Sequence, residues 1–137
     1  MNIFSRYFAL NIPSWNTILT CSTNSLEVGL LGQSAGSAEH PGWTQWNLED
    51  SWRAELPLNA SSEDTFPAGM VISTSSQIPL PWDDNQTLNP MPILFVLSTD
   101  GVLCPFHIIN LSPSAALLTH NTEELTTVNE RRGIIIS

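Results

Sequence analysis

The chain has 137 residues and a formal charge of −9, and only 12% of its residues are charged, so Ser, Thr and Asn supply most of its polarity. This length suits one domain with a hydrophobic core, and an acidic chain whose four basic residues are all arginine disfavours direct nucleic-acid binding and favours a basic protein partner or simple solubility. No stretch approaches the roughly 18 apolar residues of a membrane span, and the amino-terminal region lacks an export signal, so we expect neither membrane insertion nor export.

The first third of the chain predicts three consecutive strands joined by short turns. Strands are expected over Tyr7–Leu10, Thr17–Ser22 and Leu26–Leu31 because branched and aromatic residues gather there. Residues 11–14 and 23–25 carry Asn, Pro and Ser, which are typical of turns. This order predicts an antiparallel meander.

The middle of the chain is less regular. Gly32–Gly42 is rich in Gly, Ala and Ser, and we expect a surface loop there that is long enough to have a function. Trp43–Leu56 follows neither the helical nor the strand period, so irregular structure with some strand is expected. Pro57–Pro67 is polar and acidic, which predicts another loop, and Gly69–Ser73 predicts a short strand.

A proline-rich segment precedes the strongest element of the chain. Gln77–Pro92 is expected to be a long connector, since a central strand does not tolerate several prolines. Pro92–Asn110 predicts a β-hairpin that turns at Ser98–Gly101, and its two apolar strands predict that neighbours cover both faces. Ser112–Leu118 is expected to form a turn with at most a short helix.

These elements together predict an all-β fold. About six antiparallel strands with long loops between the groups correspond to about one and a half to two blades of a β-propeller, with the ring incomplete. A β-sandwich is the competing architecture.

Two blocks of sequence carry a family resemblance. The first is Leu97–Phe106, followed by Ile109 and Asn110, and the second combines Trp43 and Trp46 with 48–51 and 53–57. Both resemble the end of the amino-terminal β-propeller of the nucleoporin-214 family, also called CAN. The resemblance covers about residues 6–110, and residues 7–31 match the preceding blade more loosely.

The resemblance implies a fold and a cellular role. It implies the last blades of a seven-bladed propeller, over residues 1–111, followed by a polar tail over 112–137 that is extended or disordered. We expect the chain to be a fragment of a much larger nuclear-pore protein. The family's propeller docks the DEAD-box RNA helicase of mRNA export on the cytoplasmic face of the nuclear pore, among other pore proteins.

The resemblance also implies where the helicase would bind. Part of the family's docking surface lies around the loop between the Leu26–Leu31 strand and the Trp43 block, through polar and charged groups. The family carries an arginine near the position of Gly32, and this chain has a longer Ala, Gly and Ser loop instead. The candidate contacts are Gln33, Ser34, Glu39, His40 and Trp43.

The residues give little sign of catalysis. No two of the three histidines have a metal-ligand spacing, and His107 is expected to be packed within its strand. The adjacent carboxylates at 49–50, 63–64 and 83–84 are expected to be solvated, and no nucleophile elbow or phosphate loop occurs. We therefore expect no enzyme activity, metal or cofactor. Cys21 and Cys104 are interpreted as unpaired core thiols.

The five tryptophans leave a second class of function open. Tryptophan faces can stack on sugars, which is compatible with a carbohydrate-binding β-sandwich. Core packing explains the same residues, which are Trp15, Trp43, Trp46, Trp52 and Trp82.

Overall fold

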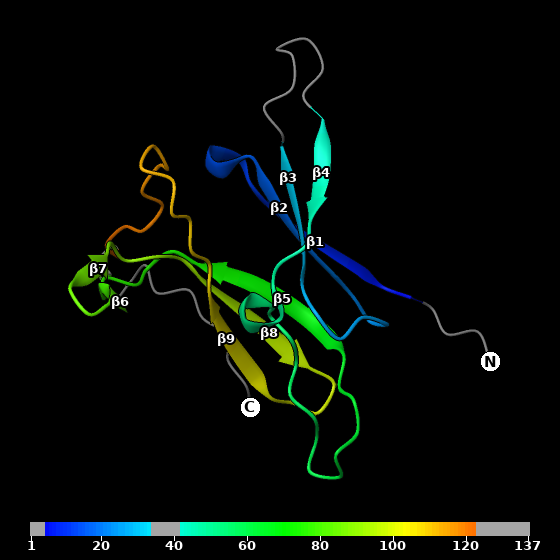
Figure 1. Cartoon of the computed structure of the whole chain (residues 1–137). Coiled ribbons are helices and arrows are strands. Elements are labelled where there is room, and N and C mark those ends of the chain that lie inside the picture. The colour runs from blue at the N-terminus through cyan, green and yellow to red at the C-terminus, as the bar shows by residue number, and fades with distance from the viewer. Residues whose placement is uncertain (1–4, 34–41, 123–137) are drawn as a thin grey trace, which may run out of the picture.

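A computed structural model of the chain describes residues 5–33 and 42–122, and within these ranges it contains three antiparallel sheets (Figure 1). The first sheet has four strands in the order β1-β2-β3-β4, the second has three in the order β5-β8-β9, and β6 pairs with β7. The strands are β1 (Tyr7–Ile12), β2 (Thr17–Ser22), β3 (Gly29–Gln33), β4 (Trp43–Trp46), β5 (Pro67–Ser73), β6 (Leu80–Asp83), β7 (Gln86–Leu88), β8 (Ile93–Ser98) and β9 (Leu103–His107).

The first sheet is the predicted meander with one further strand. Its register aligns Leu10 with Leu19, Leu19 with Leu30, and Leu30 with Trp46, so one apolar row crosses all four strands. Along β2 the buried residues alternate, as expected for a strand with one covered face. The 3₁₀ helix η1 (Pro13–Trp15) makes the connection between β1 and β2.

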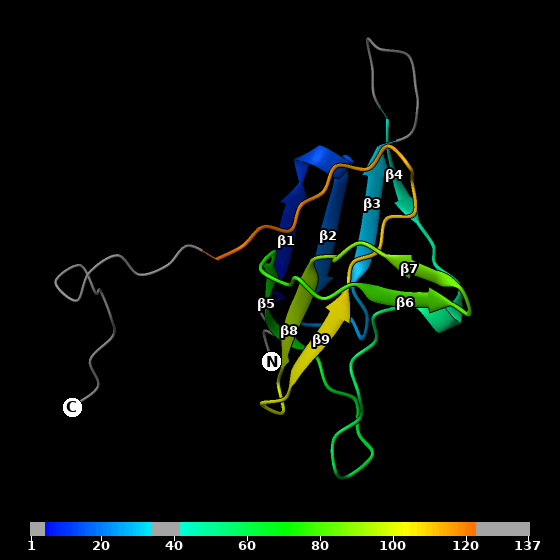
Figure 2. The ribbon, with the colours of Figure 1, turned by 90° about the vertical axis from the view of Figure 1, so that its left-hand side faces the viewer.

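The core lies between the first and second sheets. Leu94 and Val96 of β8 are 2% and 0% exposed and belong to one cluster with buried residues of β1, β2 and β9. Figure 2 shows the second sheet in front of the first. Because each fully buried aliphatic side chain contributes about 1.5 to 3 kcal/mol, this cluster is the main source of stability. Its buried members are Ile12, Leu19, Leu56, Leu94, Val96 and Cys104.

Neighbours cover only one face of the predicted hairpin within the described residues. Val71, Leu97 and Leu103 are 58%, 43% and 57% exposed. The register places Val71 opposite Phe95, and Leu97 opposite Leu103, so these four residues share the side away from the core. We call them the outer face of the second sheet. The prediction that neighbours cover both faces of the hairpin is therefore correct for the face toward the core and wrong for the outer face.

The segments between the sheets differ from expectation at two places. Residues 26–28 pair with 54–56 through a bridge between Glu27 and Glu55, so β3 begins only at Gly29. The proline-rich connector contains the β6–β7 hairpin, which lies outside both larger sheets, and this position lets Pro81 stand in a strand. The short helix η2 (Asp50–Trp52) is the one regular turn in the ambiguous segment that follows β4.

The last described residues follow the body of the protein without a helix or strand. The Nε1 of Trp15 donates a hydrogen bond to the carbonyl of Ala116 at 2.8 Å. The backbone N–H of His120 donates to the carbonyl of Thr74 at 2.9 Å. The division of the chain after residue 111 stays a prediction.

Candidate protein interface

The predicted docking loop connects β3 to β4. The register pairs Gln33, the last residue of β3, with Trp43, the first residue of β4, so these two candidates stand side by side at one end of the first sheet. Ser34, Glu39 and His40 lie outside the described residues. The structure thus brings two of the five predicted contacts together.

The helix η1 supports this end of the sheet. The backbone N–H of Gln33 donates to the carbonyl of Asn16 at 3.0 Å, and the N–H of Asn16 donates to the carbonyl of Pro13 at 3.0 Å. Asn16 has φ of 49°, a left-handed conformation that asparagine tolerates better than most residues. Gln33 is therefore held by a hydrogen bond to the residue that caps η1.

Strand β4 presents two tryptophans on opposite faces. All four of its residues are exposed, and Trp43 and Trp46 are 48% and 45% exposed. The indole of Trp46 covers Gly32, where an added Cβ would overlap the ring. Sequence reasoning singled out Trp43 but missed the contact between Trp46 and Gly32, because the intervening loop hides the cross-strand register.

The one ion-pair cluster among the described residues surrounds Arg53. Its guanidinium lies 3.8 Å from a carboxylate oxygen of Glu27 and 3.3 Å from one of Asp50, and its Nε donates to the carbonyl of Leu48 at 3.0 Å. These contacts hold the 48–53 segment against the start of β3. All three charged side chains are at least 39% exposed, so the pairs contribute little to stability.

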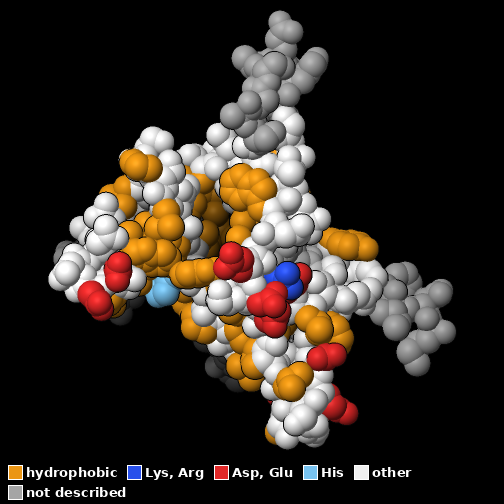
Figure 3. All heavy atoms as spheres, viewed as in Figure 1, with side chains coloured by type: hydrophobic (Ala, Val, Ile, Leu, Met, Phe, Trp, Pro, Cys, Tyr) orange, Lys and Arg blue, Asp and Glu red, His pale blue; other side chains and the backbone are white. Residues whose placement is uncertain are grey.

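An apolar groove of about 440 Å³ runs between the first and second sheets. Its floor includes the buried Leu19 and Leu94, and Figure 3 shows hydrophobic side chains around a hollow with acidic side chains beside it. Trp52 and Trp82 line it and stack on each other, with their ring centroids 5.3 Å apart. We call it the inter-sheet groove, and its further lining residues are Val28, Gly29, Leu30, Leu48, Ala54, Phe106, His107, Ile108, Ile109 and Leu111.

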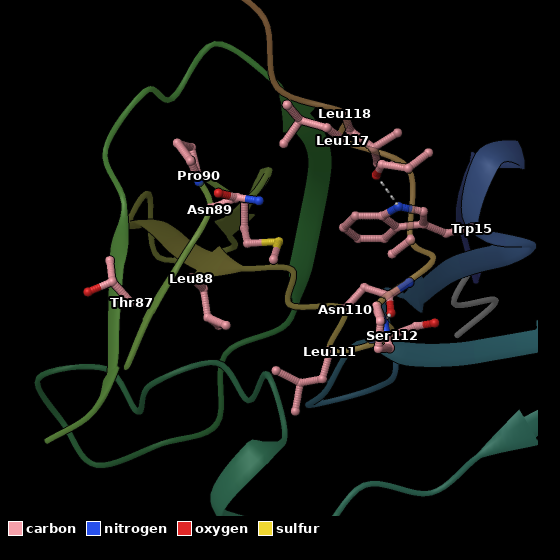
Figure 4. Close-up of a pocket in the computed structure, with 14 residues that line it drawn as sticks. Trp15, Thr87, Leu88, Asn89, Pro90, Asn110, Leu111, Ser112, Leu117 and Leu118 are labelled. Carbon is pink, nitrogen blue, oxygen red and sulfur yellow. Dashed lines mark hydrogen bonds between the residues drawn. The ribbon is translucent and has the colours of Figure 1, made fainter. Parts of the chain in front are cut away.

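A second, smaller cleft of about 280 Å³ adjoins the groove at Leu111. Figure 4 shows the Trp15 indole pointing toward the 110–118 segment, with its hydrogen bond to Ala116 drawn. The segment 87–90 lies on the other side of this cleft. The indole N–H of Trp15 is already bonded to the protein's own backbone. This cleft therefore marks where the 110–118 segment packs against the rest of the protein.

Groups that could do chemistry are separated in the described part of the chain. No cluster of three or more His, Cys, Asp or Glu residues there could hold a metal ion. His107 is exposed rather than packed within its strand. Cys21 and Cys104 are buried free thiols, and burial raises the pKa of each. No helix among the described residues is long and apolar enough to cross a membrane.

Four of the five tryptophans have internal contacts. Trp52 and Trp82 face each other at an interplanar angle of 29°, Trp46 covers Gly32, and Trp15 bonds to the backbone. These contacts use one ring face each of Trp52, Trp82 and Trp46, and Trp43 is the remaining tryptophan, so no set of parallel, open ring faces is assembled among the described residues. The arrangement gives the carbohydrate-binding alternative no support.

Comparison with known proteins gives the family. A family model described as the NUP159/214 beta propeller matches residues 5–103. The chain is 40% identical over 93% of its length to the human "Nuclear pore complex protein Nup214", and 37% identical over 77% to the Drosophila melanogaster protein of that name. It is 28% identical over 71% of its length to "Nucleoporin NUP159" of Chaetomium thermophilum.

The matches concern a small part of these relatives. The chain spans 6% of the length of the human and Drosophila proteins and 8% of the Chaetomium protein. The matched family is a propeller, and the antiparallel sheets close no ring within the described residues, so the predicted partial propeller is confirmed and the sandwich is set aside. This chain belongs to the NUP159/214 β-propeller family of nucleoporins.

Proposed function

We propose that this chain is a non-enzymatic component of the nuclear pore complex that serves as a platform for other proteins. The family match over residues 5–103 supports this role, as do relatives whose names are those of nuclear pore proteins. A propeller blade offers strand ends and loops as contact surfaces, which suits a docking function. We place it at the cytoplasmic face of the pore.

The partner proposed for this platform is the DEAD-box RNA helicase of mRNA export. The observation that carries the proposal is the pair formed by Gln33 and Trp43, held at the sheet end where the family resemblance implies docking. Trp43 is 48% exposed, and partly exposed tryptophans are common anchors of protein interfaces. The charge of −9 favours attraction to a basic surface on the partner.

Calorimetric titration of the chain with the amino-terminal RecA-like domain of the helicase tests the proposal. Trp43→Ala should weaken binding by at least about tenfold, as expected for an interface anchor. Tyr7→Ala is the matched control because Tyr7 is 81% exposed and pairs with Ser22 at the opposite end of the sheet. Equal affinity of the two variants, or no binding by the parent chain, would contradict the proposal.

A gain of affinity gives a second test. An arginine at Gly32 itself would displace the Trp46 indole, so the neighbouring Gln33 is the better position for a basic group. Because the family carries an arginine near this position, we expect an acidic helicase residue to face this end locally, even if the partner surface as a whole is basic. Gln33→Arg should then raise the affinity a few-fold at low salt, and the gain should shrink as salt screens the pair. Absence of any gain would contradict this placement. Gln86→Arg, on exposed β7 outside the first sheet, is the control.

A further inference from the structure

The inter-sheet groove has the properties of a binding site for a peptide segment. It is lined mostly by apolar side chains from six separate segments of the chain, and its volume of about 440 Å³ lies within the range of ligand pockets. Its floor reaches Leu19 and Leu94, which are 5% and 2% exposed, so a side chain that enters the groove would contact the protein core. This depth provides room for one or two large aliphatic or aromatic side chains.

The border of the groove is acidic. Glu27 precedes the lining residue Val28, and pairs of carboxylates follow two other lining residues, at 49–50 after Leu48 and at 83–84 after Trp82. Against these five carboxylates stands the guanidinium of Arg53, which already contacts Glu27 and Asp50. The border therefore attracts positive charge and repels anionic ligands such as phosphates.

We propose that the inter-sheet groove binds a peptide segment in which one or two large apolar residues are flanked by lysine or arginine. The apolar residues enter the groove and the basic residues contact the acidic border. This surface goes beyond the proposed helicase docking. Gln33 and Trp43 pair where β3 ends and β4 begins. Val28 and Gly29 line the groove at the other end of β3, where that strand begins. The two surfaces can therefore be tested separately.

Binding can be measured with defined probe peptides by fluorescence anisotropy on the full chain. The first probe is a labelled twelve-residue peptide with two adjacent leucines flanked by lysines, and the comparison peptides replace lysine by glutamate or leucine by serine. We expect the leucine–lysine peptide to bind and both replacements to lower its affinity by at least about tenfold. Raising the salt from about 50 to about 500 mM should weaken binding, since salt screens attraction at an exposed border.

Variants of the chain locate the binding site. Leu111→Asp places a charge in the groove, whereas Leu58→Asp places the same charge outside it, and the parent leucines are 57% and 58% exposed. Leu111→Asp should lower the affinity at least about fivefold and Leu58→Asp should leave it unchanged. Leu48→Asp is a second groove variant, and near-ultraviolet circular dichroism establishes that each variant keeps its aromatic packing.

Several results would overturn the proposal. Absence of binding by the leucine–lysine peptide would do so, as would equal binding of the leucine–glutamate peptide, which would show apolar adhesion alone. Equal loss in the Leu58 and Leu111 variants would place the contact outside the groove. Trp43→Ala should leave peptide binding unchanged, so failure of the helicase proposal and failure of this proposal give different results.

Discussion

The indole of Trp46 on β4 covers the backbone of Gly32 on β3, in the space that a Cβ at position 32 would occupy. The contact continues the apolar row that Leu10, Leu19 and Leu30 form across the sheet. Trp46 thereby covers the face of β3 next to the proposed docking end. Glycine is required here by close approach rather than by its backbone angles.

Replacement of Gly32 by alanine should displace the Trp46 ring. We expect a loss of about 1 to 2 kcal/mol in the free energy of unfolding, since overpacking forces neighbours to move, together with a red shift of tryptophan emission. Gly69→Ala is the control because an added Cβ there meets no atom within 4 Å. Unchanged emission in the Gly32 variant would show that the ring does not depend on this glycine.

The hydrogen bond from Trp15 to Ala116 should help to hold the 110–118 segment. Trp15→Phe keeps an aromatic ring and removes the donor, and we expect it to cost about 0.5 to 1.5 kcal/mol in denaturant unfolding. Amide exchange near residue 116 should accelerate. Trp43→Phe, at the other tryptophan of this end of the sheet, should affect neither measurement. Full protection of the segment in the Trp15 variant would mean that other contacts hold it.

The outer face of the second sheet should promote self-association of the isolated chain. Strands β5, β8 and β9 contain no Asp, Glu, Lys or Arg, and Val71 and Leu103 are more than half exposed. Exposed apolar faces of this kind associate. The double variant Val71→Thr and Leu103→Thr should shift the distribution toward monomer in analytical ultracentrifugation. Ile78→Thr, at a 73% exposed residue outside the sheets, should not.

Pro105 should protect the open edge of β9. The N–H of Ile108 donates to the carbonyl of Pro92, and the N–H of Ser98 donates to the carbonyl of Val102. Since backbone groups alternate in direction along a strand, the even-numbered residues of β9 direct their N–H and C=O groups to β8, and the odd-numbered residues direct theirs to the open edge. Pro105 thus puts a residue without an N–H at the edge. Pro105→Thr should accelerate thioflavin-positive aggregation, and Pro113→Thr, outside the strands, is the control. Equal aggregation rates would refute the protection.

The Cys21 thiol should make stability depend on alkaline pH. Burial raises its pKa in the folded state, so the folded protein holds the thiol proton when the unfolded chain has released it. The stabilising contribution is therefore complete below the unfolded pKa of about 8.5 and is lost as pH rises through the folded pKa. The free energy of unfolding should fall less steeply above that pH in Cys21→Ser. If the free energy of unfolding falls equally steeply with pH in the parent chain and in the variant, the Cys21 thiol does not cause the loss of stability.

The strands of the first and last thirds of the chain could be predicted from sequence because each is determined by local pattern. Thr17–Ser22 and the hairpin at Ser98–Gly101 carry branched residues and a turn that neighbours in sequence suffice to specify. The family could be predicted for a similar reason, since the motifs around Trp43 and Leu97 are contiguous. The acidic charge was likewise a property of composition alone.

Only the tertiary structure decided what these strands face. Trp46 meets Gly32 through a register across a loop, residues 26–28 leave the expected strand to pair with 54–56, and Trp82 joins Trp52 from a segment that the prolines predicted to be a connector. Such pairings depend on long-range packing energy rather than local propensity. The inter-sheet groove is assembled from six segments of the chain, so its lining could be known only once both sheets were in place.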